Sequence, residues 1–243
     1  MQKTLLFVLS IVLFNATQAQ VNKIPKKVKT VIDANRPADH FMIQLSSDHW
    51  TGMPDSISKN QSGFSRGLNV YIMKDKVFKN SPKFSFGIGL GIGSSNIFFK
   101  NLNVDIKSNT AKLPFTNVAA TNHFKKYKLS LSYLELPLEL RYSSNPANAN
   151  KSWKFAIGGK VGTLINAHTK GKTLLNNNNQ SINNYIQKEN SKRFFNTTRF
   201  SGTARFGYGV FSLFGAYQLN SVLKDGAGAP MKVYQVGITL SGL

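Results

Sequence analysis

Phe84-Ser-Phe-Gly-Ile-Gly-Leu-Gly-Ile-Gly93 is the stretch of sequence that decides the fold. Large apolar residues alternate strictly with serine or glycine along it. In a β-strand this period of two places every bulky side chain on one face and only small residues on the other. Glycine weakens a strand unless a close approach compensates, so we expect the small face to look into a crowded space. An apolar face against lipid and a narrow interior are what a small transmembrane β-barrel needs.

Seven further segments alternate in the same way, which predicts eight strands in all. The connections between them run alternately long and short, as in barrels with short periplasmic turns and long extracellular loops. The predicted strands cover residues 41–50, 64–73, 84–99, 129–142, 153–166, 198–208 and 210–219, and a last strand contains residues 234–241. We therefore expect an all-β fold, an eight-stranded antiparallel up-and-down transmembrane β-barrel.

The segments between the predicted strands are expected to be turns or loops. Residues 74–83 are predicted to form a turn, and residues 100–128 and 167–197 to form long polar loops. In the fourth strand the apolar positions change parity between Tyr133 and Leu134. We interpret this change as a β-bulge near Tyr133.

Aromatic residues gather near both ends of the predicted strands, which predicts two girdles at the two membrane interfaces. The outer girdle would contain Trp50, Phe64, Phe98, Phe99 and Tyr217, and the periplasmic girdle Tyr142, Trp153 and Tyr208. A soluble exported barrel of the lipocalin type is the rival fold, in which the apolar face would line a ligand cavity. The abundance of Gly and Ser on the polar face favours a tight interior over a solvated exterior.

The N-terminal residues 1–19 are predicted to be a secretory signal peptide. Lys3 precedes the apolar run Leu5–Phe14, and Thr17-Gln-Ala19 offers small residues for cleavage. The run is about half of the roughly 20 residues that a membrane-spanning helix needs. Residues 20–40 would form a basic periplasmic lead-in, and residues 41–243 the barrel. The absence of Cys excludes disulfides and a lipid-anchored cysteine.

The chain is strongly basic, with 31 Lys and Arg against 10 Asp and Glu and a net charge of +21. Such a surface attracts polyanions. Export to the outer membrane argues against nucleic acid and favours outer-membrane lipid, or an acidic protein partner. Six lysines of the predicted loop at residues 100–128 would form a basic rim for either: Lys100, Lys107, Lys112, Lys125, Lys126 and Lys128. An ordinary solvated loop is the alternative interpretation.

Charged residues also fall on the small-residue face of the predicted strands. They are Glu135, Glu139, Arg141, Lys154, Lys160, Arg199 and Arg205. An eight-stranded barrel is just wide enough for its side chains to fill it, and an unpaired buried charge is costly. We therefore expect a network of ion pairs that plugs the lumen, with a gated proton or ion path as the alternative.

No catalytic, cofactor or metal site is expected. Asp48-His49, His123 and His168 lie near predicted outer strand ends, but neighbouring strand residues point to opposite faces, so Asp48 cannot orient His49. Four scattered His without Cys disfavour a metal site. Gly158-Gly-Lys160 lacks the spacing of a phosphate-binding loop.

Ser132-Tyr-Leu-Glu-Leu-Pro-Leu-Glu-Leu-Arg-Tyr142 resembles the central signature of the PorT-like outer-membrane β-barrel proteins, which carry a Tyr-Leu-Glu-[Ile/Leu]-Pro strand. Gly-x-Gly strands at residues 86–93 and 157–162 extend the similarity over most of residues 41–243. The resemblance implies an eight-stranded barrel in the outer membrane and no catalytic residue. Some relatives serve type IX secretion or gliding.

These observations together predict a non-enzymatic barrel with a plugged lumen. Its expected role is structural, or that of an accessory in an outer-membrane secretion or assembly complex. Two alternatives remain open at this point: a small-solute channel, and an outer-membrane enzyme that modifies lipid or peptide.

Overall fold

The computed structural model describes residues 41–62 and 64–242. The predicted signal peptide and the basic lead-in lie outside the described residues. The described chain is almost entirely β-structure, with one short helix, α2 (Asp55–Ser58), and a single 3-10 turn, Ala149–Lys151. No described helix is both long and apolar enough to cross a membrane.

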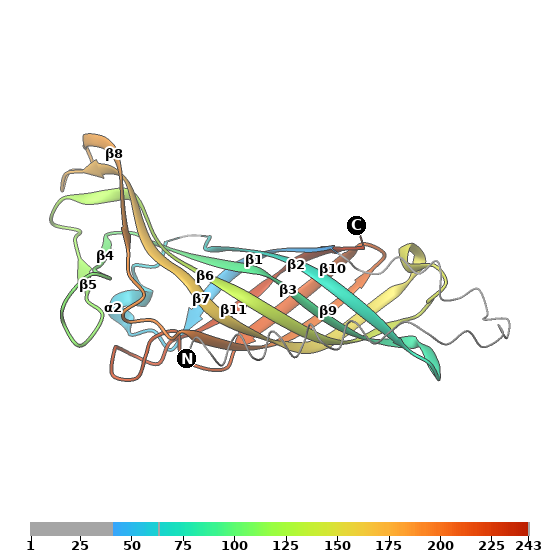
Figure 1. Cartoon of the computed structure of the whole chain (residues 1–243). Coiled ribbons are helices and arrows are strands. Elements are labelled where there is room, and N and C mark those ends of the chain that lie inside the picture. Colours follow the sequence, from blue (N-terminus) through green and yellow to red (C-terminus); the bar gives the residue numbers. More distant parts are fainter. Residues whose placement is uncertain (1–40, 63, 243) are drawn as a thin grey trace, which may run out of the picture. The chain divides into compact units, whose positions relative to one another are not determined.

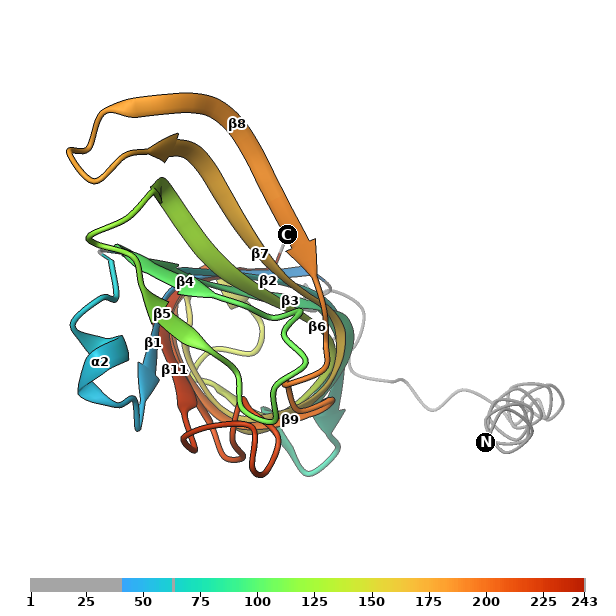
Figure 2. The ribbon, with the colours of Figure 1, turned by 90° about the vertical axis from the view of Figure 1, so that its left-hand side faces the viewer.

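Eight strands of the described chain close into an antiparallel barrel, as Figures 1 and 2 show. They are β1 (Phe41–Thr51), β2 (Arg66–Phe78), β3 (Ser81–Phe99), β6 (His123–Ser143), β7 (Trp153–Leu175), β9 (Thr198–Tyr208), β10 (Phe211–Gln218) and β11 (Lys232–Ser241). Each strand pairs with the next one around the wall, and β1 pairs with β11 to close the ring. The predicted eight-stranded barrel is confirmed.

The decisive stretch in β3 has the two expected faces. Phe86, Ile88 and Leu90 point away from the barrel and are 40%, 42% and 55% exposed. Ser85 is fully buried on the other face, and a Cβ added to Gly87 would lie 2.7 Å from Arg141 Nε. The small residues therefore leave room for charged side chains inside the barrel. An apolar exterior around a polar interior is the reverse of a lipocalin.

The barrel has a turn end and a loop end. Short connections join β2 to β3, β6 to β7 and β9 to β10 at the turn end. The prediction that residues 74–83 form a turn is wrong, because β2 continues to Phe78 and β3 begins at Ser81. The turn is thus only two residues long, since charged and polar residues continue the strand pairing past the apolar positions.

The loop end contains more strand than the sequence pattern predicts. The predicted loop at residues 100–128 holds the small hairpin of β4 (Leu102–Val104) and β5 (Phe115–Asn117), and the start of β6. The predicted loop at residues 167–197 holds the end of β7 and all of β8 (Ser181–Asn190), which pairs with β7. Figures 1 and 2 show β6, β7 and β8 continuing together past the barrel. Beyond the lipid neither face has to be uniformly apolar, so the alternation disappears although the strands persist.

The predicted bulge near Tyr133 is present, but the extra residue lies on β7 and not on β6. Tyr133 and Ser132 of β6 pair with Leu164 and Asn166 of β7, so the extra residue is Ile165. The pairing of β6 with β3 is regular through this point. The change of hydrophobic parity in β6 instead marks two different interiors, apolar beyond Tyr133 toward the loop end and charged below it.

The girdle prediction is wrong for two residues at the loop end. Trp50 and Phe99 are buried inside the barrel, where their rings meet edge to face at 5.9 Å. Phe64 faces outward as expected, and Trp153 and Tyr208 do so at the turn end. Strand position alone indicates the height of an aromatic residue, whereas its parity decides between lipid and lumen.

Candidate functional site

Glu135 of β6 is the centre of an ion-pair cluster that crosses the lumen. Its carboxylate accepts a hydrogen bond from Arg199 Nε at 3.0 Å and a closer one from Arg199 Nη2. Lys160 Nζ lies 3.3 Å from the other carboxylate oxygen, and the Tyr71 hydroxyl donates to it at 2.5 Å. Strands β2, β6, β7 and β9 therefore meet on one buried carboxylate.

The side-chain amide of Gln235 on β11 links the same cluster to Asp48 on β1. Lys160 Nζ donates to Gln235 Oε1 at 3.2 Å, and Gln235 Nε2 lies 3.0 Å from both carboxylate oxygens of Asp48. Asp48 and Glu135 offset Lys160 and Arg199, so the cluster contains two acids and two bases. We call these four residues the upper cluster. Arg199 also lies over the ring of Tyr133, 4.0 Å from its centroid.

A second cluster lies nearer the turn end. Arg141 Nε and Arg205 Nη2 both contact Glu139 Oε2, at 2.8 and 3.0 Å. Arg141 Nη1 lies 3.5 Å from Asp75 Oδ1, and Arg205 Nη1 donates to Ser241 Oγ at 3.0 Å. These two acids and two bases form the lower cluster. Glu139 is four residues from Glu135, so the clusters are separated by about 13 Å along the strand.

The structure thus brings six of the seven predicted lumen residues into two clusters and places Lys154 half-buried on the inward face of β7. The sequence analysis missed the contributions of Tyr71, Asp75, Asp48 and Gln235. Asp75 follows Tyr71 at the spacing of one face of a strand, so extending the alternation of β2 would have found it. The prediction that residues 74–83 form a turn hid the inward position of Asp75.

Apolar residues from the loops and from the loop-end parts of β1, β3, β6 and β11 fill the lumen above the upper cluster. We call this group the cap: Trp50, Ile57, Ile97, Phe99, Leu102, Val104, Ile106, Leu113, Leu129, Leu131, Phe194, Phe195, Val222, Leu223, Ala227, Met231 and Val233. Backbone hydrogen bonds tie the loops together, from Leu113 N to Ala227 O at 2.8 Å and from Lys224 N to Phe194 O at 2.9 Å. The four connections at the loop end therefore fold as one apolar lid on the barrel.

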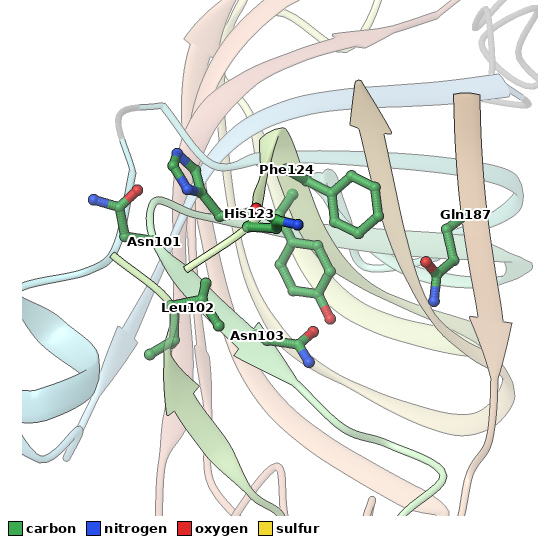
Figure 3. Close-up of a pocket in the computed structure, with 9 residues that line it drawn as sticks. Asn101, Leu102, Asn103, His123, Phe124 and Gln187 are labelled. Carbon is green, nitrogen blue, oxygen red and sulfur yellow. The ribbon is translucent and has the colours of Figure 1, made fainter. Parts of the chain in front are cut away.

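A polar pocket of about 160 Å³ lies between the β4–β5 hairpin and the inner side of β6 and β8. Figure 3 shows Asn101 and Asn103 on one side of it and Phe124 and Gln187 on the other. His123 is held by Thr121 O at 3.1 Å and by Asn179 Oδ1 at 3.2 Å. Amides, one imidazole and aromatic rings line the pocket, so it suits a neutral polar group better than acid–base chemistry.

His49 and Asp48, neighbours near the loop end, lie on opposite faces of β1. His49 stacks on Tyr234 with ring centroids 5.0 Å apart, and its Nε2 lies 2.8 Å from Ser47 Oγ. Asp48 is buried on the opposite, lumen-facing side of β1. Across the described residues, no three His, Cys, Asp or Glu side chains come together as a metal site would require.

The six lysines of the predicted rim separate into two groups. Lys125, Lys126 and Lys128 lie on β6 and line an open groove of about 620 Å³ together with Phe64 and Arg66. The other three lie on connections of the loop end, Lys100 between β3 and β4, and Lys107 and Lys112 between β4 and β5. The rim is therefore a strand-borne group on the wall and a loop-borne group around the cap.

One comparison with known proteins, that with family models, agrees with this architecture. The model of the outer membrane protein beta-barrel domain family matches residues 18–222. Among solved structures, Ail, the attachment invasion locus protein of Yersinia pestis in complex with the heparin analogue sucrose octasulfate, is similar at a TM-score of 0.34 with 12% identity, over 83% of this chain and 94% of that chain. A mutant porin of Rh. blastica has a TM-score of 0.18 and 10% identity, over 83% of this chain and 98% of the porin.

A comparison with curated proteins gave no match. The structural similarity scores are too low to add to the assignment, which rests on the family model and on the closed barrel. The chain belongs to the outer membrane protein beta-barrel domain family, and it is an eight-stranded antiparallel barrel of the outer membrane.

Proposed function

We propose that this barrel has a plugged lumen and acts without catalysis, as a structural or accessory component of an outer-membrane secretion or assembly complex. The observation that carries the proposal is the double obstruction of the lumen, by the two ion-pair clusters and by the cap above them. A solute would have to displace both. The PorT-like resemblance of residues 132–142 supports the accessory role.

The upper cluster supports a closed interior on grounds of size and charge. The space beside Arg199, bounded by Ser201, Gln218 and Gln235, has no room for a water molecule. Separating Glu135 from its two cations would leave buried charges without partners, which is strongly unfavourable. Fixed and balanced charges therefore argue for a structural plug over an ion path.

The loop end supports the interaction part of the proposal. In barrels of the outer membrane the long connections face the outside of the cell, so we assign the loop end to the cell surface. Because the cap joins the four connections, they present one fixed surface. A preformed surface binds a partner with a smaller loss of conformational entropy than separate mobile loops would.

We expect planar-bilayer recordings of the purified full-length barrel to show no stable large conductance. The reason is the combination of a narrow lumen, paired charges and an apolar cap. Recordings over a range of voltages check this expectation, with a wide porin as the positive control for insertion. A clean, voltage-independent conductance would contradict the plugged lumen and favour the small-solute channel.

Affinity purification from native outer membranes, followed by mass spectrometry, tests the accessory role. We expect a stoichiometric barrel or periplasmic partner to purify with the wild-type protein. A variant with Lys100, Lys107 and Lys112 replaced by Gln is expected to lose a partner that binds the cap. A matched variant with Lys74, Lys76 and Lys79 at the turn end replaced by Gln removes the same charge and is expected to keep it. Recovery of every variant without a partner would end the accessory proposal.

A further inference from the structure

A row of cations crosses the outer wall at the loop end. Lys128 of β6 pairs in register with Lys170 of β7, and Lys170 pairs with Lys188 of β8. On the other side, Lys128 Nζ donates to Asn96 Oδ1 of β3 at 2.6 Å, and Asn96 pairs with Arg66 of β2. We call Arg66, Lys128, Lys170 and Lys188 the basic row. It spans five strands that lie side by side, and Asn96 of β3 lies between Arg66 and Lys128.

The basic row points away from the lumen. Lys128 lies between buried Tyr127 and Leu129, and Lys170 between buried Thr169 and Gly171. Because neighbouring strand residues point to opposite faces, both lysines are on the outer face. Residues that pair directly across strands share a face, so Lys188 is there as well.

Within the protein the positive charge of this row is not offset. Like charges placed directly opposite each other destabilise a sheet. Among the described residues, no carboxylate forms an ion pair with any member of the basic row. Burial, followed by Lys170, Arg66 and Lys188, lowers the pKa of Lys128, which lies beyond the apolar band. The arrangement therefore costs the isolated protein stability, and an anion bound across the strands would remove that cost.

The position of the row relative to the apolar band indicates where that anion lies. Leu68 is the last outward apolar residue before Arg66, which lies two residues, or about 7 Å, farther along β2. Lys128 lies six residues beyond Leu134, or about 20 Å along a tilted strand. A bilayer adds about 5–7 Å of polar headgroup on each side of its hydrocarbon core. The row thus begins at the headgroup level and rises above it.

The groove between Arg66 and Lys128 has an amphipathic lining. The Arg66 guanidinium lies over the rings of Phe64 and Phe98, 5.9 and 5.6 Å from their centroids. Lys128 Nζ lies 5.9 Å from the Phe98 centroid, and Phe64 is 62% exposed. Aromatic rings at this height match the interface between acyl chains and headgroups, and the cations beside them match phosphate oxygens.

We propose that the basic row binds the phosphate groups of a phosphorylated glycolipid of the outer leaflet. The acyl chains would lie against the outward leucines and isoleucines of β2, β3 and β6, and the phosphates would bridge lysines that otherwise repel each other. The assignment goes beyond the proposed function, which concerns the lumen and a partner at the cap. It predicts a lipid fixed to one side of the barrel.

Lipid binding to the purified full-length protein in detergent tests the proposal. The probes are lipid A with both phosphates, the same lipid after removal of its phosphates, and inorganic phosphate alone. Native mass spectrometry or a fluorescence titration would give the affinities. We expect the wild type to bind the bisphosphorylated lipid at least 10-fold more tightly than the dephosphorylated one, and inorganic phosphate only weakly.

Substitutions in the basic row are expected to distinguish lipid binding at this site from general attraction between a positively charged protein and an anionic lipid. Replacing Lys128, Lys170 and Lys188 together with Gln should weaken binding of the bisphosphorylated lipid about 100-fold. The matched triple variant at Lys100, Lys107 and Lys112 loses the same charge and should stay within about twofold of the wild type. Without lipid, the row variant should unfold at the same temperature as the wild type or higher, because repulsion has been removed.

Three outcomes would overturn the proposal. One is equal affinity for the phosphorylated and dephosphorylated lipids. Another is an equal loss of binding in the row variant and the loop variant. The third is a row variant that keeps the lipid but loses the protein that purifies with the barrel, which would make the row a protein interface. Failure of the cap to retain a partner would leave the lipid result unaffected, so the two proposals are tested separately.

Discussion

Replacing Glu135 with alanine is expected to lower the free energy of unfolding of the barrel by about 3–5 kcal/mol. The substitution removes the only described carboxylate that pairs with Lys160 and Arg199, and both cations are buried. It also takes the acceptor from the buried Tyr71 hydroxyl. Urea unfolding in detergent, and the temperature at which the barrel loses its compact gel mobility, would measure the effect.

Glu189 provides the matched control for this prediction. It is a half-exposed residue of β8 at the loop end, where its carboxylate accepts a hydrogen bond from Gln187 at 3.2 Å. Because such groups contribute little, Glu189→Ala should change the free energy of unfolding by less than about 1 kcal/mol. A second variant, Glu135→Ala with Lys160→Met, should recover part of the loss, since one buried cation is removed with its partner. Equal effects at Glu135 and Glu189 would contradict the view that the ion pairs of the lumen stabilise the barrel.

Replacing Gly158 with alanine is expected to lower the free energy of unfolding by about 2–3 kcal/mol, a large effect for one methyl group. A Cβ at this position would overlap the main-chain carbonyl oxygen of Leu138 and lie 2.9 Å from Glu139 Cα. Both atoms belong to the neighbouring strand, so no side-chain rotation can relieve the contact. Ordinarily a Gly to Ala change stabilises by about 0.4–1 kcal/mol, because it restricts the unfolded chain.

Gly202 allows a direct comparison with Gly158, because it lies on the next strand and no atom beyond its own residue and its two chain neighbours lies within 4 Å of its added Cβ. We expect Gly202→Ala to leave the free energy of unfolding within about 0.5 kcal/mol of the wild type, or to raise it. The same unfolding measurement serves both variants. If both substitutions were neutral, the close packing of β6 against β7 would not be what requires glycine at residue 158.

The amino-acid sequence by itself determined the strands that cross the membrane. Lipid requires an apolar outer face, and a narrow lumen requires small or polar residues inside, so the period of two in residues 84–93 favoured a transmembrane barrel over a lipocalin-type barrel. The same parity placed Glu135, Glu139, Arg141, Lys160, Arg199 and Arg205 in the lumen. Beyond the lipid neither face has to be apolar, so the alternation is lost. The start of β6, the end of β7 and all of β8 were therefore predicted to be loops.

Only the tertiary structure decided which charges meet and what covers them. Glu135 and Arg199 lie on strands separated by β7, and Tyr71 reaches the same carboxylate from β2. Such partners depend on the register of every strand around the ring, which one strand's sequence does not contain. The cap has the same origin, because its residues come from four connections and from four strands, and their apolar side chains come into contact only after the barrel closes. Parity along a strand is a local property, whereas partners across a closed ring are a property of the whole sheet.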